Sequence, residues 1–208
     1  MRKSLFTAIA ILLSIIVVPA MSAQKADKKK VIEDLKAAFT GETTASAKYA
    51  AYAEKARMEG FGKIALLFEA ASKAENIHAG NHQAALEQLG VSAPAVEPKY
   101  EVRSTKENLQ DAIKGETYES ETMYPNFIRD GNEARVTIAL ITFNYAHKTE
   151  MKHKALYEEA LKALEADNID NLASKYQVCT TCGNTYQNEG PARCGICMTS
   201  NDRFITIE

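Results

Sequence analysis

The chain has 208 residues, of which 46% are hydrophobic and 25% charged, so it can bury one sizeable core and carry a small additional module. Its formal net charge is -2, and no stretch of lysine and arginine is interleaved with aromatic residues. Because nucleic-acid binding requires such a basic surface, we expect no nucleic-acid partner.

The N-terminal segment predicts export from the cytoplasm. Arg2 and Lys3 precede an almost uninterrupted apolar run over residues 5–18, which is followed by small residues suited to cleavage, namely Ala20, Ser22 and Ala23. We interpret residues 1–23 as a signal peptide and place the mature protein in the periplasm. The apolar run is near the minimum length that spans a bilayer, so an uncleaved anchor in the inner membrane is the alternative.

Four stretches of the remaining chain have apolar residues at helical spacing, which predicts helices over residues 31–57, 61–89, 105–129 and 133–166. Residues 91–104 contain Pro94 and Pro98 without a helical period, so they predict a long connection. Pro125 should kink or interrupt the third helix near its end. Four long helices with one long middle connection predict an all-α, antiparallel bundle of the ferritin-like kind over residues 27–167.

Both halves of this predicted bundle contain the same polar pattern, a glutamate followed 33 or 34 residues later by Glu-x-x-His: Glu42, Glu75 and His78, then Glu116, Glu150 and His153. A helix presents residues three apart on one face, and all four glutamates fall in register with apolar stripes. Burying converging carboxylates either raises their pKa values strongly or requires cations. Metal ions are the simplest such cations, and the pattern resembles that of the di-iron and di-manganese carboxylate proteins, which implies such a site in the bundle core.

Glu119 adds a fifth carboxylate to the second half, at a position where the first half has Ala45. Four glutamates balance the charge of two ferrous ions, and the harder ferric ion prefers oxygen over imidazole. We therefore hypothesise that Glu119 replaces His78 as a ligand when the iron is oxidised. His82 and His147 lack a repeated partner, and we interpret them as supporting or surface residues rather than ligands.

The cysteines form two C-x2-C pairs separated by eleven residues: Cys179, Cys182, Cys194 and Cys197. This spacing predicts a tetrahedral site of four thiolates in a separate, mainly β domain over residues 174–208. The spacing alone does not separate iron from zinc, so a structural zinc ribbon is one alternative. Two disulfides are another, because an exported protein meets oxidising conditions.

Together these motifs resemble rubrerythrin, a family of ferritin-like di-iron proteins with a C-terminal rubredoxin-like iron site, over residues 31–208. The resemblance also includes the segments Gly41-Glu42, Gly115-Glu116-x-x-Glu119 and Met123-Tyr124-Pro125. It implies two non-haem irons in the bundle and one iron among the four cysteines. By this resemblance, Glu75 and Glu150 would bridge the two bundle irons, and Glu42 and Glu116 would be terminal ligands.

The remaining roles are also implied by the resemblance. His153 would bind one iron, whereas His78 and Glu119 would exchange on the other. Tyr49 and Tyr124 match the family's tyrosines beside the di-iron centre, although ordinary core packing would explain their positions equally well.

The resemblance implies a peroxidase that reduces hydrogen peroxide to water, with electrons passed inward through the thiolate-bound iron from a rubredoxin-like donor or a reductase. In relatives, the rubredoxin-like domain of one subunit lies near the di-iron site of another, which implies a homodimer or larger homo-oligomer. Two features of this chain depart from the family pattern. Gly195 stands where the family usually has proline, and export leaves the electron donor open because most relatives are cytoplasmic.

Two other classes of function compete with the peroxidase. A ferroxidase or iron-buffering protein could use the same carboxylate cluster, but it needs no internal electron relay, so zinc in the cysteine site would favour it. A metal-stabilised structural protein is the third class, and the additional charge of Glu119 argues against it.

Overall fold

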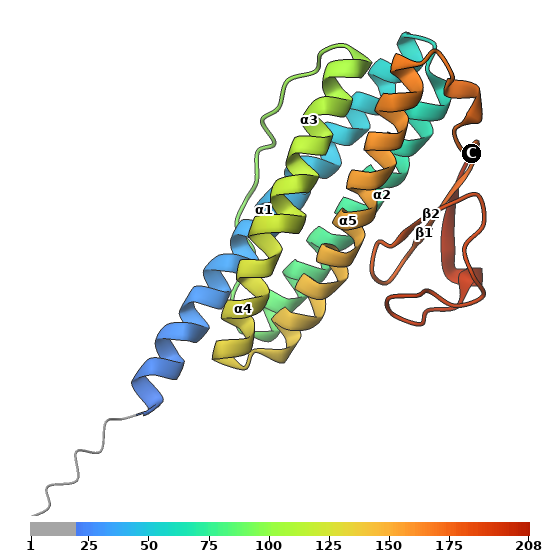
Figure 1. Ribbon diagram of the computed structural model, residues 1–208. Coiled ribbons are helices and arrows are strands. Elements are labelled where there is room, and N and C mark those ends of the chain that lie inside the picture. The colour runs from blue at the N-terminus through green and yellow to red at the C-terminus, as the bar shows by residue number, and fades with distance from the viewer. Residues whose placement is uncertain (1–19) are drawn as a thin grey trace, which may run out of the picture.

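The computed structural model describes the backbone of residues 20–208 and the side chains of residues 28–208. Within this part of the chain, α1 (Ala20–Met58), α2 (Gly62–Gln88) and α5 (Thr137–Glu165) pack with a segmented third helix into an elongated bundle (Figure 1). Residues 91–104 run along the outside of the bundle and connect its two helix pairs (Figure 1). The predicted bundle with one long middle connection is confirmed.

The segmented helix consists of α3 (Thr105–Tyr118), the π-helical turn η1 (Glu119–Met123) and α4 (Tyr124–Ala134). The irregularity expected near Pro125 is thus a widened turn rather than an end, and the helix continues to Ala134 instead of stopping near residue 129. Pro125 lies in the first turn of α4, where a missing N–H is best tolerated.

Two other helix boundaries differ from the predicted ones. α1 begins at Ala20 rather than at residue 31. α5 begins at Thr137 rather than at residue 133, because Arg135 takes the left-handed conformation, with φ of 56°, and terminates the preceding helix.

Two apolar clusters occupy the bundle, one toward each end. α1 contributes Tyr49 to one cluster and Leu35 to the other, and α5 contributes Tyr157 and Phe143 in the same way. Between the clusters lies a layer of buried polar side chains from the middle of the helices, namely Glu42, Glu75, His78, Glu116, Glu150 and His153. The fold therefore surrounds a polar layer with apolar packing on both sides.

The C-terminal domain contains a three-stranded antiparallel sheet in the order β2-β1-β3, built from β1 (Tyr176–Cys179), β2 (Thr185–Gln187) and β3 (Phe204–Ile207). The sheet lies beside the bundle, next to α2 and α5 (Figure 1). Tyr176, Val178 and Ile207 join one of the bundle's apolar clusters, which fixes the domain against the helices.

Most of the predicted export segment, residues 1–19, lies outside the described residues. In the part that the structure describes, no helix combines the length and the apolar character needed to cross a membrane. The signal peptide stays a prediction.

Candidate metal centres

The polar layer forms two overlapping groups of metal-ligating side chains. One group is Glu42, Glu75, His78 and Glu150, and the other is Glu75, Glu116, Glu150 and His153. Within each group, the candidate ligand atoms all lie within 4.8 Å of one another. Because the same two glutamates belong to both groups, the arrangement fits two neighbouring ions bridged by two carboxylates.

The carboxylate oxygens of this layer lack the hydrogen bonds that burial normally demands. Glu42 Oε2 and Glu116 Oε2 have no hydrogen-bond partner, and all four side chains are at most 1% exposed. Glu75 Oε1 and both oxygens of Glu150 make no well-formed hydrogen bond either, and face only a histidine Nδ1 at 2.8–3.1 Å. A buried, unpaired carboxylate is strongly unfavourable unless a cation compensates it. These orphaned oxygens match the donor set of hard metal ions such as iron.

Both histidines turn Nδ1 toward the carboxylates and Nε2 toward the cysteine domain. His78 Nε2 lies 3.0 Å from the carbonyl oxygen of Cys182, and since a carbonyl only accepts, Nε2 carries the proton. His153 Nε2 lies 2.9 Å from Thr185 Oγ1, which donates to the carbonyl of Gly183, so here too Nε2 donates. When it is neutral, each imidazole thereby presents the Nδ1 lone pair to the polar layer, as a metal ligand must.

Electrostatics in the layer favour positive charge. Burial lowers the pKa of His153, but Glu75 and Glu150 outweigh it and raise the pKa to about 9. Burial raises the pKa of Glu75 and of Glu116, and Glu150 raises both further. His78 Nδ1 lies 2.9 Å from Glu75 and 2.8 Å from Glu150. Protons or metal ions must therefore neutralise the cluster.

The two candidate tyrosines hydrogen-bond to Glu116 and Glu42 across the halves of the bundle. Tyr49 Oη donates to Glu116 Oε1 at 2.7 Å, and Tyr124 Oη donates to Glu42 Oε1. Burial raises the pKa of each tyrosine well above its usual value, so both hydroxyls stay protonated and keep donating. The two tyrosines therefore do more than fill the core, because each one holds a buried carboxylate in place.

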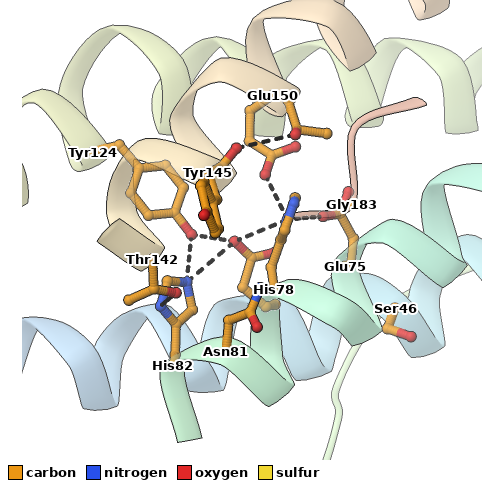
Figure 2. Close-up of polar contacts among 12 residues, drawn as sticks. Ser46, Glu75, His78, Asn81, His82, Tyr124, Thr142, Tyr145, Glu150 and Gly183 are labelled. Carbon is orange, nitrogen blue, oxygen red and sulfur yellow. Dashed lines mark hydrogen bonds and ion pairs between the residues drawn. The ribbon is translucent and has the colours of Figure 1, made fainter. Parts of the chain in front are cut away.

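The structure places His82 behind this network and not among the candidate ligands (Figure 2). His82 Nε2 lies 3.0 Å from Tyr124 Oη, and Thr142 Oγ1 lies 2.9 Å from His82 Nδ1. Since the Tyr124 hydroxyl donates to Glu42, it accepts from His82, and Thr142 then donates to the other ring nitrogen. The interpretation of His82 as a supporting residue agrees with this geometry.

Glu119 lies at the start of η1, beside the two groups of candidate ligands but outside them. Glu119 is partly buried, and burial together with the charges of Glu42 and Glu150 raises its pKa well above the usual value. His78 belongs to the ligand group and Glu119 does not. This geometry is compatible with the hypothesised ligand exchange, which stays a prediction.

The four cysteines converge at the edge of the C-terminal domain, and all have free thiols. Sγ atoms lie 3.5 Å apart in the pairs Cys179 with Cys197 and Cys182 with Cys194. Sulfurs at about 2.3 Å from a tetrahedral ion are separated by roughly 3.8 Å, whereas bonded sulfurs lie about 2.05 Å apart. The cluster therefore fits a metal site, and the two disulfides are not formed.

The cysteine domain docks directly on the polar layer of the same chain. Besides the bond from His78 to the carbonyl of Cys182, Asn81 Nδ2 donates to the carbonyl of Thr181 at 2.9 Å. Figure 2 shows Gly183 next to His78. A Cβ atom at Gly183 would lie 2.4 Å from His78 Nε2, and its φ of +74° also favours glycine. The contact therefore depends on the absence of a side chain here.

Gly195 supplies a hydrogen bond that a proline could not make. Its N–H donates to Tyr186 Oη at 2.9 Å, and this hydroxyl lies 3.5 Å from Cys194 Sγ. The departure from the usual proline thus adds a donor beside the thiolates, rather than simply loosening the loop.

Sequence reasoning missed the contacts made by Thr185 and by the carbonyl of Cys182, because a backbone acceptor has no side-chain signature. It also missed the π-turn, for which a signal exists. Tyr49 follows Glu42 by seven positions, whereas Tyr124 follows Glu116 by eight. The additional residue is absorbed by the widened turn, which returns the tyrosine to the inner face.

Comparison with known proteins agrees with this architecture. The rubrerythrin family model matches residues 33–161. Nigerythrin from Nitratidesulfovibrio vulgaris is 37% identical over 175 residues, which cover 83% of this chain and 84% of that protein. Rubrerythrin-2 from Clostridium acetobutylicum is 32% identical over 171 residues, covering 82% of this chain and 92% of the relative.

Solved structures extend the likeness to both domains. The fully reduced, all-ferrous nigerythrin structure has a TM-score of 0.76 at 36% identity and covers 85% of this chain and 86% of that one. A bacterioferritin from Rhodobacter capsulatus, at 19% identity and a TM-score of 0.62, shares the fold alone. The ferritin-like fold class is confirmed.

Replacing Gly183 with alanine should push the cysteine domain away from His78. We expect Gly183→Ala to lower the free energy of unfolding by about 1–3 kcal/mol, because the added methyl group overpacks the contact. Both metal sites should still bind metal, while electron exchange between them slows. Gly195→Ala is the matched control, since its Cβ would meet nothing closer than Tyr186 Oη at 3.8 Å. Equal effects of the two variants would contradict the docking geometry.

Replacing Glu75 with glutamine should affect the metal-free and iron-loaded protein in opposite directions. Burial and Glu150 raise the pKa of Glu75, so above about pH 4.3 its charge destabilises the metal-free fold. We expect Glu75→Gln to stabilise the chelator-treated protein at pH 8 by about 1–2 kcal/mol and to weaken iron binding. This stabilisation should vanish at acid pH, where the Glu75 carboxyl is protonated in both the folded and the unfolded state. Thermal unfolding with and without iron measures both effects. If Glu75→Gln shifted the unfolding temperature in the same direction in both states, the result would contradict a metal-bridging role for Glu75.

Proposed function

Because this chain belongs to the rubrerythrin family, we propose that it is a non-haem di-iron peroxidase, which reduces hydrogen peroxide to water with electrons relayed through its four-cysteine iron site. Family membership supports a di-iron protein of oxidative-stress defence. The carboxylate–histidine cluster and the cysteine cluster fit the two iron sites of that family. The peroxidase reaction itself is our proposal.

The observation that carries the proposal is the position of His78. Its Nδ1 faces the carboxylates and its Nε2 donates to the carbonyl of Cys182, so one side chain joins the two clusters. A site that only oxidises or stores iron needs no such connection to a thiolate centre. The contact therefore favours a reaction that repeatedly draws electrons inward.

The overall reaction consumes one hydrogen peroxide, two electrons and two protons and produces two water molecules. When bound, the two irons supply the electron pair that cleaves the O–O bond. Glu42 and Glu116 would hold the irons from the outer sides of the site, and Tyr124 and Tyr49 orient these two carboxylates. Apolar packing on both sides of the polar layer limits the access of bulk water.

We further propose that the protein is exported and works in the periplasm, on the basis of its N-terminal sequence. Since no nicotinamide pool exists there, the donor would be a rubredoxin-like protein or a reductase facing the same compartment. A homodimer is proposed from the resemblance alone, because the described contact between module and bundle lies within one chain.

An anaerobic mixing experiment tests the function. We expect the fully reduced, iron-loaded protein to regain the visible colour of ferric thiolate rapidly with hydrogen peroxide and much more slowly with dioxygen. Cys197→Ser, which alters the thiolate site at its most exposed cysteine, should keep the first two-electron turnover and lose steady-state turnover. Equal response to both oxidants, or a cysteine site that holds zinc, would instead favour a ferroxidase or iron-buffering protein.

A further inference from the structure

The π-turn η1 carries Glu119, and one of its carbonyl groups lacks a backbone donor. Tyr124 N–H donates to the carbonyl of Glu119, five residues earlier, as π-helical geometry requires. The next carbonyl, that of Ser120, would accept from residue 125 in the same pattern. Residue 125 is proline, which has no N–H, so the backbone leaves the Ser120 carbonyl unpaired.

A side chain from another helix replaces the missing donor. His147 Nε2 lies 2.9 Å from the Ser120 carbonyl oxygen, and because that oxygen only accepts, the imidazole donates. Ser120 is buried, with 7% of its surface exposed, so an unpaired carbonyl there would be costly. His147 lies on α5, one turn before Glu150, and therefore ties the turn that carries Glu119 to a helix that supplies candidate ligands.

We propose that His147 is a positioning residue that holds the π-turn in place and thereby sets the reach of Glu119 toward the metal pair. The hydrogen bond itself is independent of the chemistry. Only its catalytic consequence rests on the proposed function and on ligand exchange by Glu119.

The position of the turn explains why loss of this hydrogen bond should loosen it without unfolding the protein. Ser120, Pro125 and His147 line a surface groove of about 580 Å³. Water entering this groove can replace the imidazole as a donor, although without tying η1 to α5. The expected effect is thus local.

Hydrogen–deuterium exchange of the iron-loaded, full-length protein tests the hydrogen bond without peroxide. In His147→Leu we expect amides of residues 119–124 to exchange about five- to tenfold faster, while the other helices and the colour of the cysteine site are unchanged. Lys154→Met is the matched control. Lys154 also joins α5 to η1, through Glu121 at 2.7 Å, but the pair is exposed and satisfies no buried carbonyl. We expect near wild-type exchange in this variant.

Two further variants keep the test decisive. His147→Gln retains an N–H donor and should restore slow exchange. Pro125→Ala restores a backbone N–H at residue 125, so adding it to His147→Leu should recover most of the lost protection, which a merely space-filling histidine would not explain. If His147→Leu leaves exchange in η1 unchanged, or if neither the glutamine nor the proline substitution rescues it, the proposal is wrong.

A spectroscopic measurement on the same variants tests the catalytic consequence. With peroxide, His147→Leu should change the absorption of the oxidised di-iron centre, whereas Lys154→Met should match the wild type. If His147→Leu exchanged faster but its oxidised spectrum were unchanged, the hydrogen bond to the π-turn would be supported and its effect on Glu119 would be disproved. Failure of wild-type protein to react with peroxide would overturn the proposed function and leave the exchange result intact.

Discussion

Four carboxylates, each at most 1% exposed, share one layer of the bundle, and the rest of the site depends on neutralising them. Like charges at this separation repel strongly in a dry interior, so the fold must supply protons or metal ions between them. This need is the common cause of three observations: the unpaired carboxylate oxygens, the inward Nδ1 atoms of the two histidines, and the raised pKa values of Glu75 and His153. Tyr49 and Tyr124 contribute by fixing the outer carboxylates without adding charge.

The same layer explains how the cysteine domain is placed. Each candidate ligand histidine has a second nitrogen that must be satisfied, and the domain supplies both acceptors, a backbone carbonyl for His78 and a hydroxyl for His153. Those bonds select the tautomer that leaves Nδ1 free to ligate. Docking of the domain and preparation of the metal ligands are therefore one structural event, for which Gly183 provides the space.

Much of this could be predicted from the sequence, because helical periodicity and metal-ligand spacing are local properties. The apolar stripes placed Glu42, Glu75, Glu116 and Glu150 on core-facing positions, and the cysteine spacing indicated a four-thiolate site. Contacts between distant segments were not predictable in this way. The pairing of each tyrosine with the glutamate of the other half depends on how the helices cross.

Other features left only a faint trace in the sequence. The π-turn was readable as one additional residue between Glu116 and Tyr124, but only when the two halves were compared at that position. The hydrogen bond from His147 to the turn could not be inferred, since it joins α5 to a carbonyl whose lack of a donor becomes apparent only once the π-turn is known.

Mössbauer spectroscopy of protein loaded with ⁵⁷Fe, combined with metal analysis, tests the central claim that the polar layer is a di-iron centre beside a thiolate iron. We predict three irons per chain, with two in an oxygen and nitrogen environment and one among four sulfurs. The two should be magnetically coupled in the oxidised state. A single iron per chain, or an uncoupled pair, would contradict the assignment of the buried carboxylates to a shared metal site.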